Sequence, residues 1–275
     1  MRFVDQVGIV TGAGSGIGEA VARRFSDEGT AVVLAGRTRA KLDHVAADLP
    51  PERTLVKVCD VARYRQVEAL VEAAVRRFGR LDVMVNNARV APEGKATEAT
   101  LAEWEEVMAI NAGGVFHGCR AALPHLLASR GCIVNMASVS GLGGDWCLSF
   151  YNASKGAIVN FTRALALDHG RDGVRVNCVC PSFTRTPMTA DMQKDRKVMA
   201  KFRERIPLGR PAGLEEVAAV VAFLARSLGG RETGLRRRLN RCQGHRGGAA
   251  GGRRPLRLQR PARHGVTELV TYVRK

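Results

Sequence analysis

A glycine-rich loop near the start of this 275-residue chain constrains its fold more than any other feature. The apolar run 7–10 precedes the loop, and a helical pattern over 19–28 follows it. Glycines placed between a strand and a helix in this way are typical of a phosphate-binding turn. The loop reads Thr11-Gly12-Ala13-Gly14-Ser15-Gly16-Ile17-Gly18. The sequence therefore predicts a strand–loop–helix unit at the beginning of an α/β domain.

Apolar runs and helical patterns continue to alternate along the chain. We expect further strands at 31–35, 55–58, 82–85, 132–136 and 174–179, and helices at 41–49, 66–78, 103–129, 151–169 and 214–225. Short buried strands that alternate with long helices indicate parallel strands joined by helical crossovers. We predict an α/β, Rossmann-like fold, a doubly wound parallel sheet with helices on both faces, in a single domain over 1–226.

The net charge of +17 is concentrated in the last part of the chain. Residues 226–275 hold 14 Lys and Arg against two acidic residues, so the preceding residues carry only +5. The tail 227–275 is rich in arginine and glycine and poor in apolar residues, which predicts disorder or a frameshift near 227–234. Instead of being disordered, the tail could supply a substitute strand at 266–273. A different function is also open, that of a catalytically impaired protein whose basic tail binds nucleic acid.

Composition also indicates the compartment. No apolar run approaches the roughly 20 residues that span a bilayer, and the first expected strand follows Met1 too closely for a secretory signal. Seven cysteines without framework spacing favour a reducing environment. We expect a cytoplasmic protein with no membrane partner and no metal site, and we do not expect nucleic acid to be its main partner.

The glycine loop predicts a dinucleotide site. Gly12 permits a tight turn, while Gly16 and Gly18 let the backbone approach a pyrophosphate, with Ser15 and Ile17 beside them. The N-terminus of the following helix would direct free N–H groups and a positive dipole at that anion. A plain strand–helix turn is the alternative for the loop taken alone.

The ends of the next strands indicate which dinucleotide binds. Arg37, at the end of the second strand, can pair with the 2′-phosphate of NADP(H), so NADP(H) is favoured over NAD(H). A solvated arginine in a surface turn is the simpler alternative. Asp60 and Val61 follow the third strand, and Asn87 and Ala88 follow the fourth. Ligands of open α/β sheets bind at these carboxyl ends, so we expect all four to border the cofactor.

Tyr151 and Lys155 lie four residues apart in an expected helix and therefore share one face. A nearby ammonium lowers the pKa of a phenol, so we predict that Lys155 activates Tyr151 as a proton relay and also binds the nicotinamide ribose. Ser138, just after a strand, can donate to a substrate carbonyl. Asn111 can hold a water that links Lys155 to solvent. Together these residues predict hydride transfer between a nicotinamide and an alcohol or ketone.

These motifs, in this order, resemble the short-chain dehydrogenase/reductase family over 1–226. The resemblance implies a catalytic tetrad of Asn111, Ser138, Tyr151 and Lys155, and a homo-oligomer, commonly a tetramer. It also implies that Pro181, Ser182 and Thr184 lie near the nicotinamide amide, and that the segment 186–206 forms a mobile lid that sets specificity.

Two stretches, 122–127 and 137–146, more specifically resemble the meso-2,3-butanediol dehydrogenases (acetoin or diacetyl reductases). A carbonyl reductase or secondary-alcohol dehydrogenase follows from this resemblance. A 3-oxoacyl thioester reductase is the enzymatic alternative.

The chain departs from the family pattern at three places. Arg89 stands where the family has glycine, and we expect it to weaken cofactor binding without abolishing it. The acid that butanediol dehydrogenases usually carry after the second strand is absent. The basic tail replaces a final hydrophobic strand.

Overall fold

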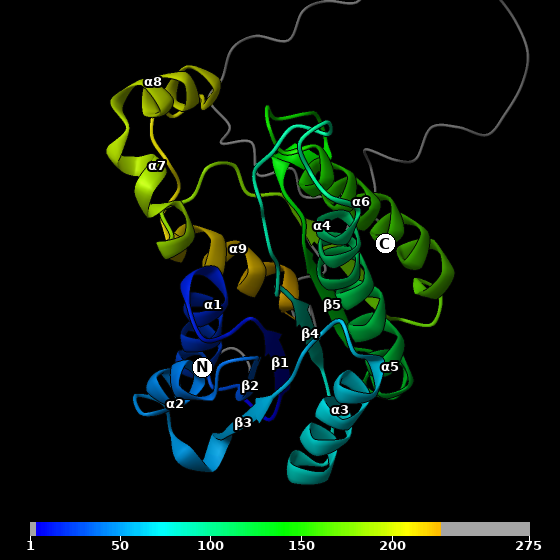
Figure 1. The fold of residues 1–275 in the computed structure, drawn as a ribbon. Coiled ribbons are helices and arrows are strands. Elements are labelled where there is room, and N and C mark those ends of the chain that lie inside the picture. The colour runs from blue at the N-terminus through cyan, green and yellow to red at the C-terminus, as the bar shows by residue number, and fades with distance from the viewer. Residues whose placement is uncertain (1–3, 227–275) are drawn as a thin grey trace, which may run out of the picture. The chain divides into compact units, whose positions relative to one another are not determined.

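The computed structural model describes residues 4–226, and the predictions for the tail, including the frameshift and the substitute strand, lie outside this range. Helices and strands alternate along the described chain (Figure 1). The strands are β1 (Val7–Thr11), β2 (Ala31–Gly36), β3 (Thr54–Val58), β4 (Val83–Asn86), β5 (Cys132–Met136) and β6 (Arg175–Val179). The α-helices are α1 (Gly16–Asp27), α2 (Arg39–Ala46), α3 (Tyr64–Phe78), α4 (Leu101–Val107), α5 (Gly114–Ser129), α6 (Ser149–His169), α7 (Ala190–Lys194), α8 (Arg196–Arg205) and α9 (Leu214–Ala225). Short 3₁₀ turns cover Pro51–Arg53, Val139–Gly141 and Pro187–Thr189, and Met108–Gly113 forms a π-helical turn.

The strands form one parallel sheet in the order β3-β2-β1-β4-β5-β6. This order, in which the chain winds outward from β1 and then from β4, is that of dinucleotide-binding doubly wound folds. The direction of winding reverses between β1 and β4, so a crevice forms at the carboxyl ends of these two strands. The predicted fold class is confirmed.

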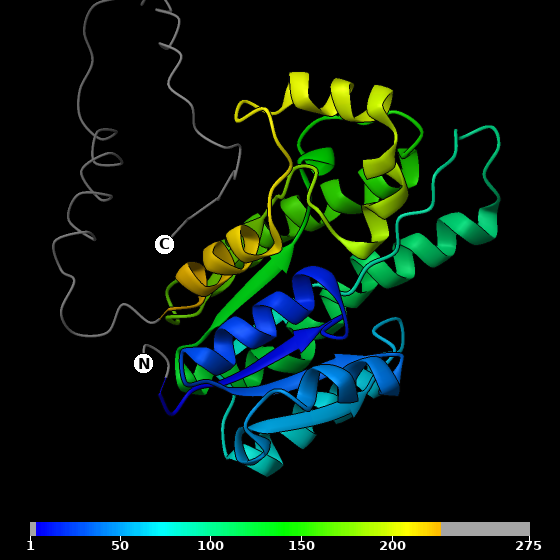
Figure 2. The same ribbon diagram turned by 90° about the vertical axis from the view of Figure 1, so that its left-hand side faces the viewer.

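Helices cover both faces of the sheet. Ile9 of β1 packs into a core with α3, α5 and α6, whereas its neighbour Val10 packs into a core with α1, α2 and α9. Because successive side chains of a strand point to opposite faces, a strand buried on both faces must be apolar throughout. Figures 1 and 2 show α1 and α9 side by side on one of these faces.

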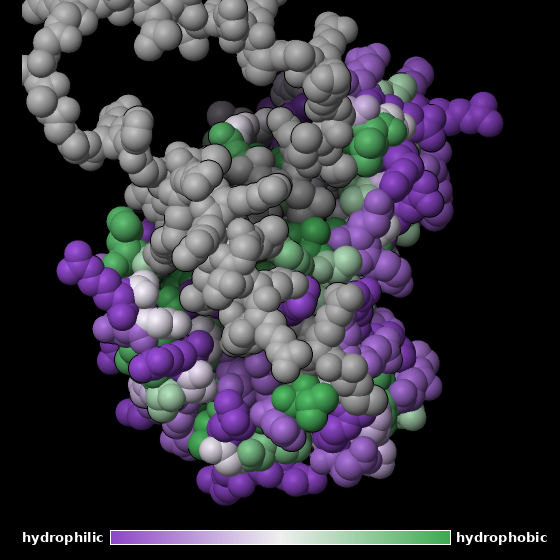
Figure 3. Space-filling view, turned by 180° about the vertical axis from the view of Figure 1, so that it is seen from behind, coloured by the Kyte–Doolittle hydropathy of each residue, from purple (hydrophilic) through white to green (hydrophobic). Residues whose placement is uncertain are grey.

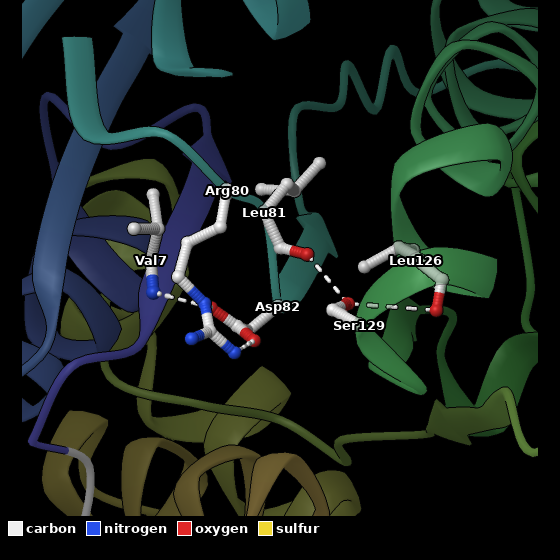
Figure 4. Close-up of polar contacts among 6 residues, drawn as sticks. All are labelled: Val7, Arg80, Leu81, Asp82, Leu126 and Ser129. Atoms are coloured by element: carbon white, nitrogen blue, oxygen red, sulfur yellow. Dashed lines mark hydrogen bonds and ion pairs between the residues drawn. The ribbon is translucent and has the colours of Figure 1, made fainter.

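A buried carboxylate fixes the amino ends of β1 and β4. Asp82 accepts a hydrogen bond from the backbone N–H of Val7 at 2.9 Å and pairs with Arg80 at 2.7 Å (Figure 4). Ser129, the last residue of α5, donates to the carbonyl of Leu81 at 2.7 Å. These contacts anchor the sheet at the end opposite the crevice.

Two of the predicted helices differ from the observed ones. The first begins at Gly16 and not at residue 19, because the glycines of the loop already belong to the first helical turn. The pattern over 103–129 was predicted as one helix, but a π-helical turn separates α4 from α5. A π-turn accommodates one additional residue in a helix, and such turns occur often at functional sites.

The visible surface of residues 4–226 is largely hydrophilic when the molecule is seen from behind, with hydrophobic side chains in small separate groups (Figure 3). Within this part of the chain, no helix is both long enough and apolar enough to cross a bilayer.

Candidate active site

The glycine loop is packed tightly against the residues after β4. Gly12 has a φ of +65°, and a Cβ there would lie 2.9 Å from the side-chain nitrogen of Asn87. Asn87 donates to the carbonyl of Thr11 at 2.9 Å, which ties the two strand ends together. A Cβ at Gly18 would lie 2.1 Å from the carbonyl oxygen of Gly12. The missing side chain of Gly18 is therefore required for the packing of the loop, and its predicted role at a phosphate stays a prediction.

The amino end of α1 has the features of a pyrophosphate site. A cavity of about 130 Å³ opens there beside Gly12, Ser15, Gly16 and Ile17. Ser15 precedes the helix without capping it through its side chain, so it leaves the first-turn N–H groups available to an anion. A Cβ at Gly16 would meet its nearest neighbour only at 3.8 Å, so the backbone is accessible. These residues fit the pyrophosphate of a dinucleotide.

A second cavity, of about 180 Å³, extends from the loop toward the end of β2. Its lining includes Arg37, Thr38, Lys41, Asp60, Val61 and Ala88. Arg37 is exposed and forms no ion pair within residues 4–226, whereas Arg39 donates two hydrogen bonds to Asp43 at 2.8 and 2.9 Å. Arg37 is thus the arginine of this turn that is available to a phosphate.

A cleft of about 710 Å³ lies at the carboxyl ends of β5 and β6 beneath the lid segment (186–206). Ser138 and Tyr151 both line it. Burial raises the pKa of Tyr151, and the positive charge of Arg89 and the nearby hydroxyl of Ser138 oppose this rise. Tyr151 is therefore protonated at neutral pH.

The residues predicted to border the nicotinamide amide also line the cleft: Pro181, Ser182 and Thr184.

Lys155 is fully buried beside Tyr151. Its Nζ donates to the carbonyl of Met136 at 2.7 Å and lies 5.5 Å from the centre of the Tyr151 ring. Burial, reinforced by Arg89, lowers the pKa of Lys155 to about 7. The prediction that an adjacent ammonium lowers the pKa of Tyr151 is wrong for this structure, since desolvation of both groups outweighs their proximity.

The lowered pKa of Lys155 predicts a pH-dependent stability. In the unfolded chain this lysine holds its proton up to about pH 10.5, whereas in the native state it releases the proton above about pH 7. The unfolded state therefore binds more protons, and the free energy of unfolding should rise by about 1.5 kcal/mol between pH 7 and 8.5. Denaturant unfolding at both pH values should show this rise for the wild type and not for Lys155→Met. Equal pH dependence in the two proteins would contradict the assignment.

Asn111 lies in the π-helical turn and binds the loop after β4. Its side chain accepts from the N–H of Val90 and donates to the carbonyl of Val90, both at 2.9 Å, and it also donates to Ser154 at 3.0 Å. The side chain makes no direct contact with Lys155. Its observed role is to hold the loop that carries Arg89.

Arg89 lies where the three cavities meet and lines each of them. Its Nη2 lies 3.5 Å from the sulfur of Met188 in the lid segment. Its Nε is buried and has no hydrogen-bond partner among the described residues. The guanidinium therefore lies between the cavity that contains Arg37 and the cleft that contains Ser138 and Tyr151.

Sequence reasoning missed three polar residues that are linked to Ser138. Ser140 follows it by two residues, Asp145 lies in the loop before α6, and Arg205 ends α8. No sequence pattern connects Asp145 with Arg205, because they are 60 residues apart. Five charged residues of the lid segment are exposed: Asp191, Lys194, Asp195, Arg196 and Lys197.

The fold and the site together define a nicotinamide-dinucleotide oxidoreductase, and comparison with known proteins supports this class. A family profile described as enoyl-(acyl carrier protein) reductase matches residues 12–235. The chain is 51% identical over 225 residues to the meso-2,3-butanediol dehydrogenase of Serratia marcescens, covering 82% of this chain and 89% of that protein. It is 39% identical to the L-fucose dehydrogenase of Bos taurus, covering 82% and 84%. It is 35% identical to a 3-oxoacyl-(acyl-carrier-protein) reductase of Thermotoga maritima, covering 82% and 92%.

The chain belongs to the short-chain dehydrogenase/reductase family and is an NAD(P)(H)-dependent oxidoreductase.

Proposed function

We propose that this enzyme interconverts a ketone and a secondary alcohol with NADP(H), and that its substrates are of the diacetyl, acetoin or butanediol type. The observation that carries the proposal is that Ser138 and Tyr151 line one cleft of about 710 Å³, which also contacts Ile17 of the dinucleotide loop. The identity of 51% to a meso-2,3-butanediol dehydrogenase supports the substrate class.

Each catalytic side chain has a defined task in ketone reduction. The bound nicotinamide supplies the hydride to the carbonyl carbon. Ser138 donates a hydrogen bond to the carbonyl oxygen, and Tyr151 transfers its proton to that oxygen as the negative charge develops. Because the pKa of Tyr151 is raised, the residue holds this proton at neutral pH. Lys155, from its buried position, returns a proton to Tyr151 after each reduction. In alcohol oxidation the same groups act in reverse.

A direct assay tests the proposal. Purified protein is mixed with NADPH or NADH and with diacetyl, acetoin or a 3-oxoacyl thioester, and the absorbance at 340 nm is followed. Oxidation of NADPH with diacetyl or acetoin is the expected result. Turnover of the thioester alone would favour the alternative, which the Thermotoga relative supports. Absence of turnover with all three substrates, in a sample folded by circular dichroism, would contradict the proposal.

Arg37 should determine the preference for NADPH. Replacing it with alanine removes the free guanidinium at the 2′-phosphate end of the cleft. A charge-assisted hydrogen bond at an exposed position contributes about 1.4 kcal/mol, so KM for NADPH should rise about tenfold. KM for NADH should stay within about twofold, because NADH has no 2′-phosphate.

Arg39→Ala is the matched control for this variant. It removes an arginine from the same turn, but one whose guanidinium is already bound to Asp43. KM for NADPH should be unchanged in this control. Equal effects of the two variants would show that Arg37 acts through general charge and does not bind the 2′-phosphate.

Two further properties belong to the proposal. Exposed Phe116 and Leu167, on the outer surfaces of α5 and α6, support a homo-oligomer, since apolar groups at such positions are often covered by another subunit. The six cysteines within residues 4–226 are all free thiols, which supports a reducing, cytoplasmic location.

A further inference from the structure

A chain of hydrogen bonds runs from the lid segment to the catalytic serine. Arg205, at the end of α8, pairs with one carboxylate oxygen of Asp145 at 2.6 Å. The other oxygen accepts a hydrogen bond from the hydroxyl of Ser140 at 2.5 Å. The hydroxyl of Ser138 donates to that of Ser140 at 3.1 Å, and the N–H of Ser140 donates back to Ser138 at 3.2 Å. The oxygen of Ser138 is therefore positioned by groups that are themselves held by the lid.

The carboxylate of the ion pair at the lid end of this chain is largely buried. The side chains of Arg205 and Asp145 are 44% and 13% exposed, whereas those of the Lys194–Asp191 pair on α7 are 78% and 95% exposed. Ion pairs that are partly removed from water are screened less than exposed ones, which contribute little. The guanidinium of Arg205 also lies 5.1 Å above the ring of Trp146, where a cation–π contact adds to the pairing.

The loop that carries Asp145 is rigidly held on the other side. Asn152 of α6 donates to the carbonyl of Asp145 at 2.9 Å, and Gly94 donates to the carbonyl of Cys147 at 2.8 Å. A small apolar cluster joins the lid to the loop after β6, where the rings of Phe183 and Phe202 lie 4.5 Å apart. The Arg205–Asp145 pair is therefore the principal polar contact between the lid segment and the loop that carries Asp145.

We propose that the Arg205–Asp145 pair latches the lid over the cleft and, through Ser140, fixes the oxygen of Ser138, whose proton turns from Ser140 to the substrate carbonyl during reduction. Asp145 and Arg205 are positioning residues. They couple closure of the lid to the placement of Ser138. A substrate beneath an open lid would thus meet a misplaced serine, and reaction would wait for closure. This inference rests on the proposed ketone reductase activity, so its test includes a measurement that needs no turnover.

Three variants of the full chain interrupt the proposed connection at different points. Arg205→Met and Asp145→Asn break the latch, whereas Ser140→Ala leaves the ion pair and removes the link to Ser138. Asp191→Asn removes the exposed lid ion pair and serves as the matched control. The double variant of Arg205→Met with Asp145→Asn tests whether the two residues act as a unit.

Hydrogen exchange followed by mass spectrometry measures the latch without turnover. Arg205→Met and Asp145→Asn should speed exchange in 196–206 and in 138–141, and Asp191→Asn should not. Ser140→Ala should speed exchange only in 138–141. Unchanged exchange in 196–206 of both latch variants would overturn the latch whether or not the enzyme reduces diacetyl.

Kinetics with diacetyl and NADPH measure the coupling. The kcat of both latch variants and of Ser140→Ala should fall about tenfold, since misplaced catalytic groups lose rate steeply, with KM for NADPH within about twofold of wild type. The double variant should be no slower than either single one. A kcat within twofold of wild type in the latch variants, or an equal loss in Asp191→Asn, would overturn the coupling. Inactivity of the wild type with every ketone would count against the proposed function, while the exchange data would still decide the latch.

Discussion

Replacing Tyr151 with phenylalanine is expected to lower kcat for ketone reduction by about 10²–10⁴-fold, the usual range for loss of a positioned proton donor. The hydroxyl of Tyr151 is the acid in the cleft beside Ser138, and its raised pKa keeps it protonated at neutral pH. Phenylalanine keeps the ring and removes only this proton. Steady-state rates at 340 nm with saturating NADPH and diacetyl measure the loss.

Tyr64→Phe is the control for this prediction. Tyr64 contacts the ring of His117 at the start of α3 and does not line the cleft, so its kcat should remain within about twofold of wild type. Binding of NADPH, followed by fluorescence titration, should be retained in Tyr151→Phe. A Tyr151→Phe enzyme with more than about a tenth of wild-type kcat would require another proton donor.

Arg89→Gly is expected to tighten NADPH binding by about 10–100-fold. The guanidinium separates the cavity at Arg37 from the cleft at Tyr151, and a dinucleotide extended between them has to displace it. Displacing a packed side chain costs about 1–3 kcal/mol, which sets the expected range. Fluorescence titration with NADPH measures the dissociation constant directly.

Arg89→Met distinguishes the effect of the side chain's volume on NADPH affinity from the effect of its charge. Methionine removes the charge and keeps most of the volume, so we expect a much smaller gain in affinity than with glycine. Weaker binding in both variants would show instead that Arg89 is a ligand of the cofactor phosphates. Loss of the charge should also raise the pKa of Lys155, because Arg89 is one of the groups that lower it.

Much of the fold follows from the sequence because the physical signals are local. Each strand is an apolar run that must be buried on both faces, and the glycine loop requires a strand before it and a helix after it. The π-helical turn at Met108–Gly113 was not predictable in this way. Its extra residue is held by the bonds of Asn111 to Val90, which come from a distant part of the chain.

The candidate site was predictable in its residues but not in its contacts. The spacing of Tyr151 and Lys155 places both on one face of α6, yet a lysine side chain is long enough to turn elsewhere, and it reaches the carbonyl of Met136. The link between Asp145 and Arg205 depends on where the lid lies, which no local pattern specifies. Side-chain direction and long-range pairing are therefore what the structure adds.

The two hydrogen bonds between Asn111 and Val90 affect how fast the cofactor can enter. They immobilise the backbone next to Arg89, so the arginine can leave the crevice only by rotating its own side chain. Rotamer changes of side chains near a surface take picoseconds to nanoseconds, far less than the microseconds or more of collective loop opening. The obstruction by Arg89 should consequently lower the association rate of the dinucleotide in proportion to the fraction of molecules whose Arg89 has rotated away, and leave its dissociation rate close to that of an unobstructed cleft.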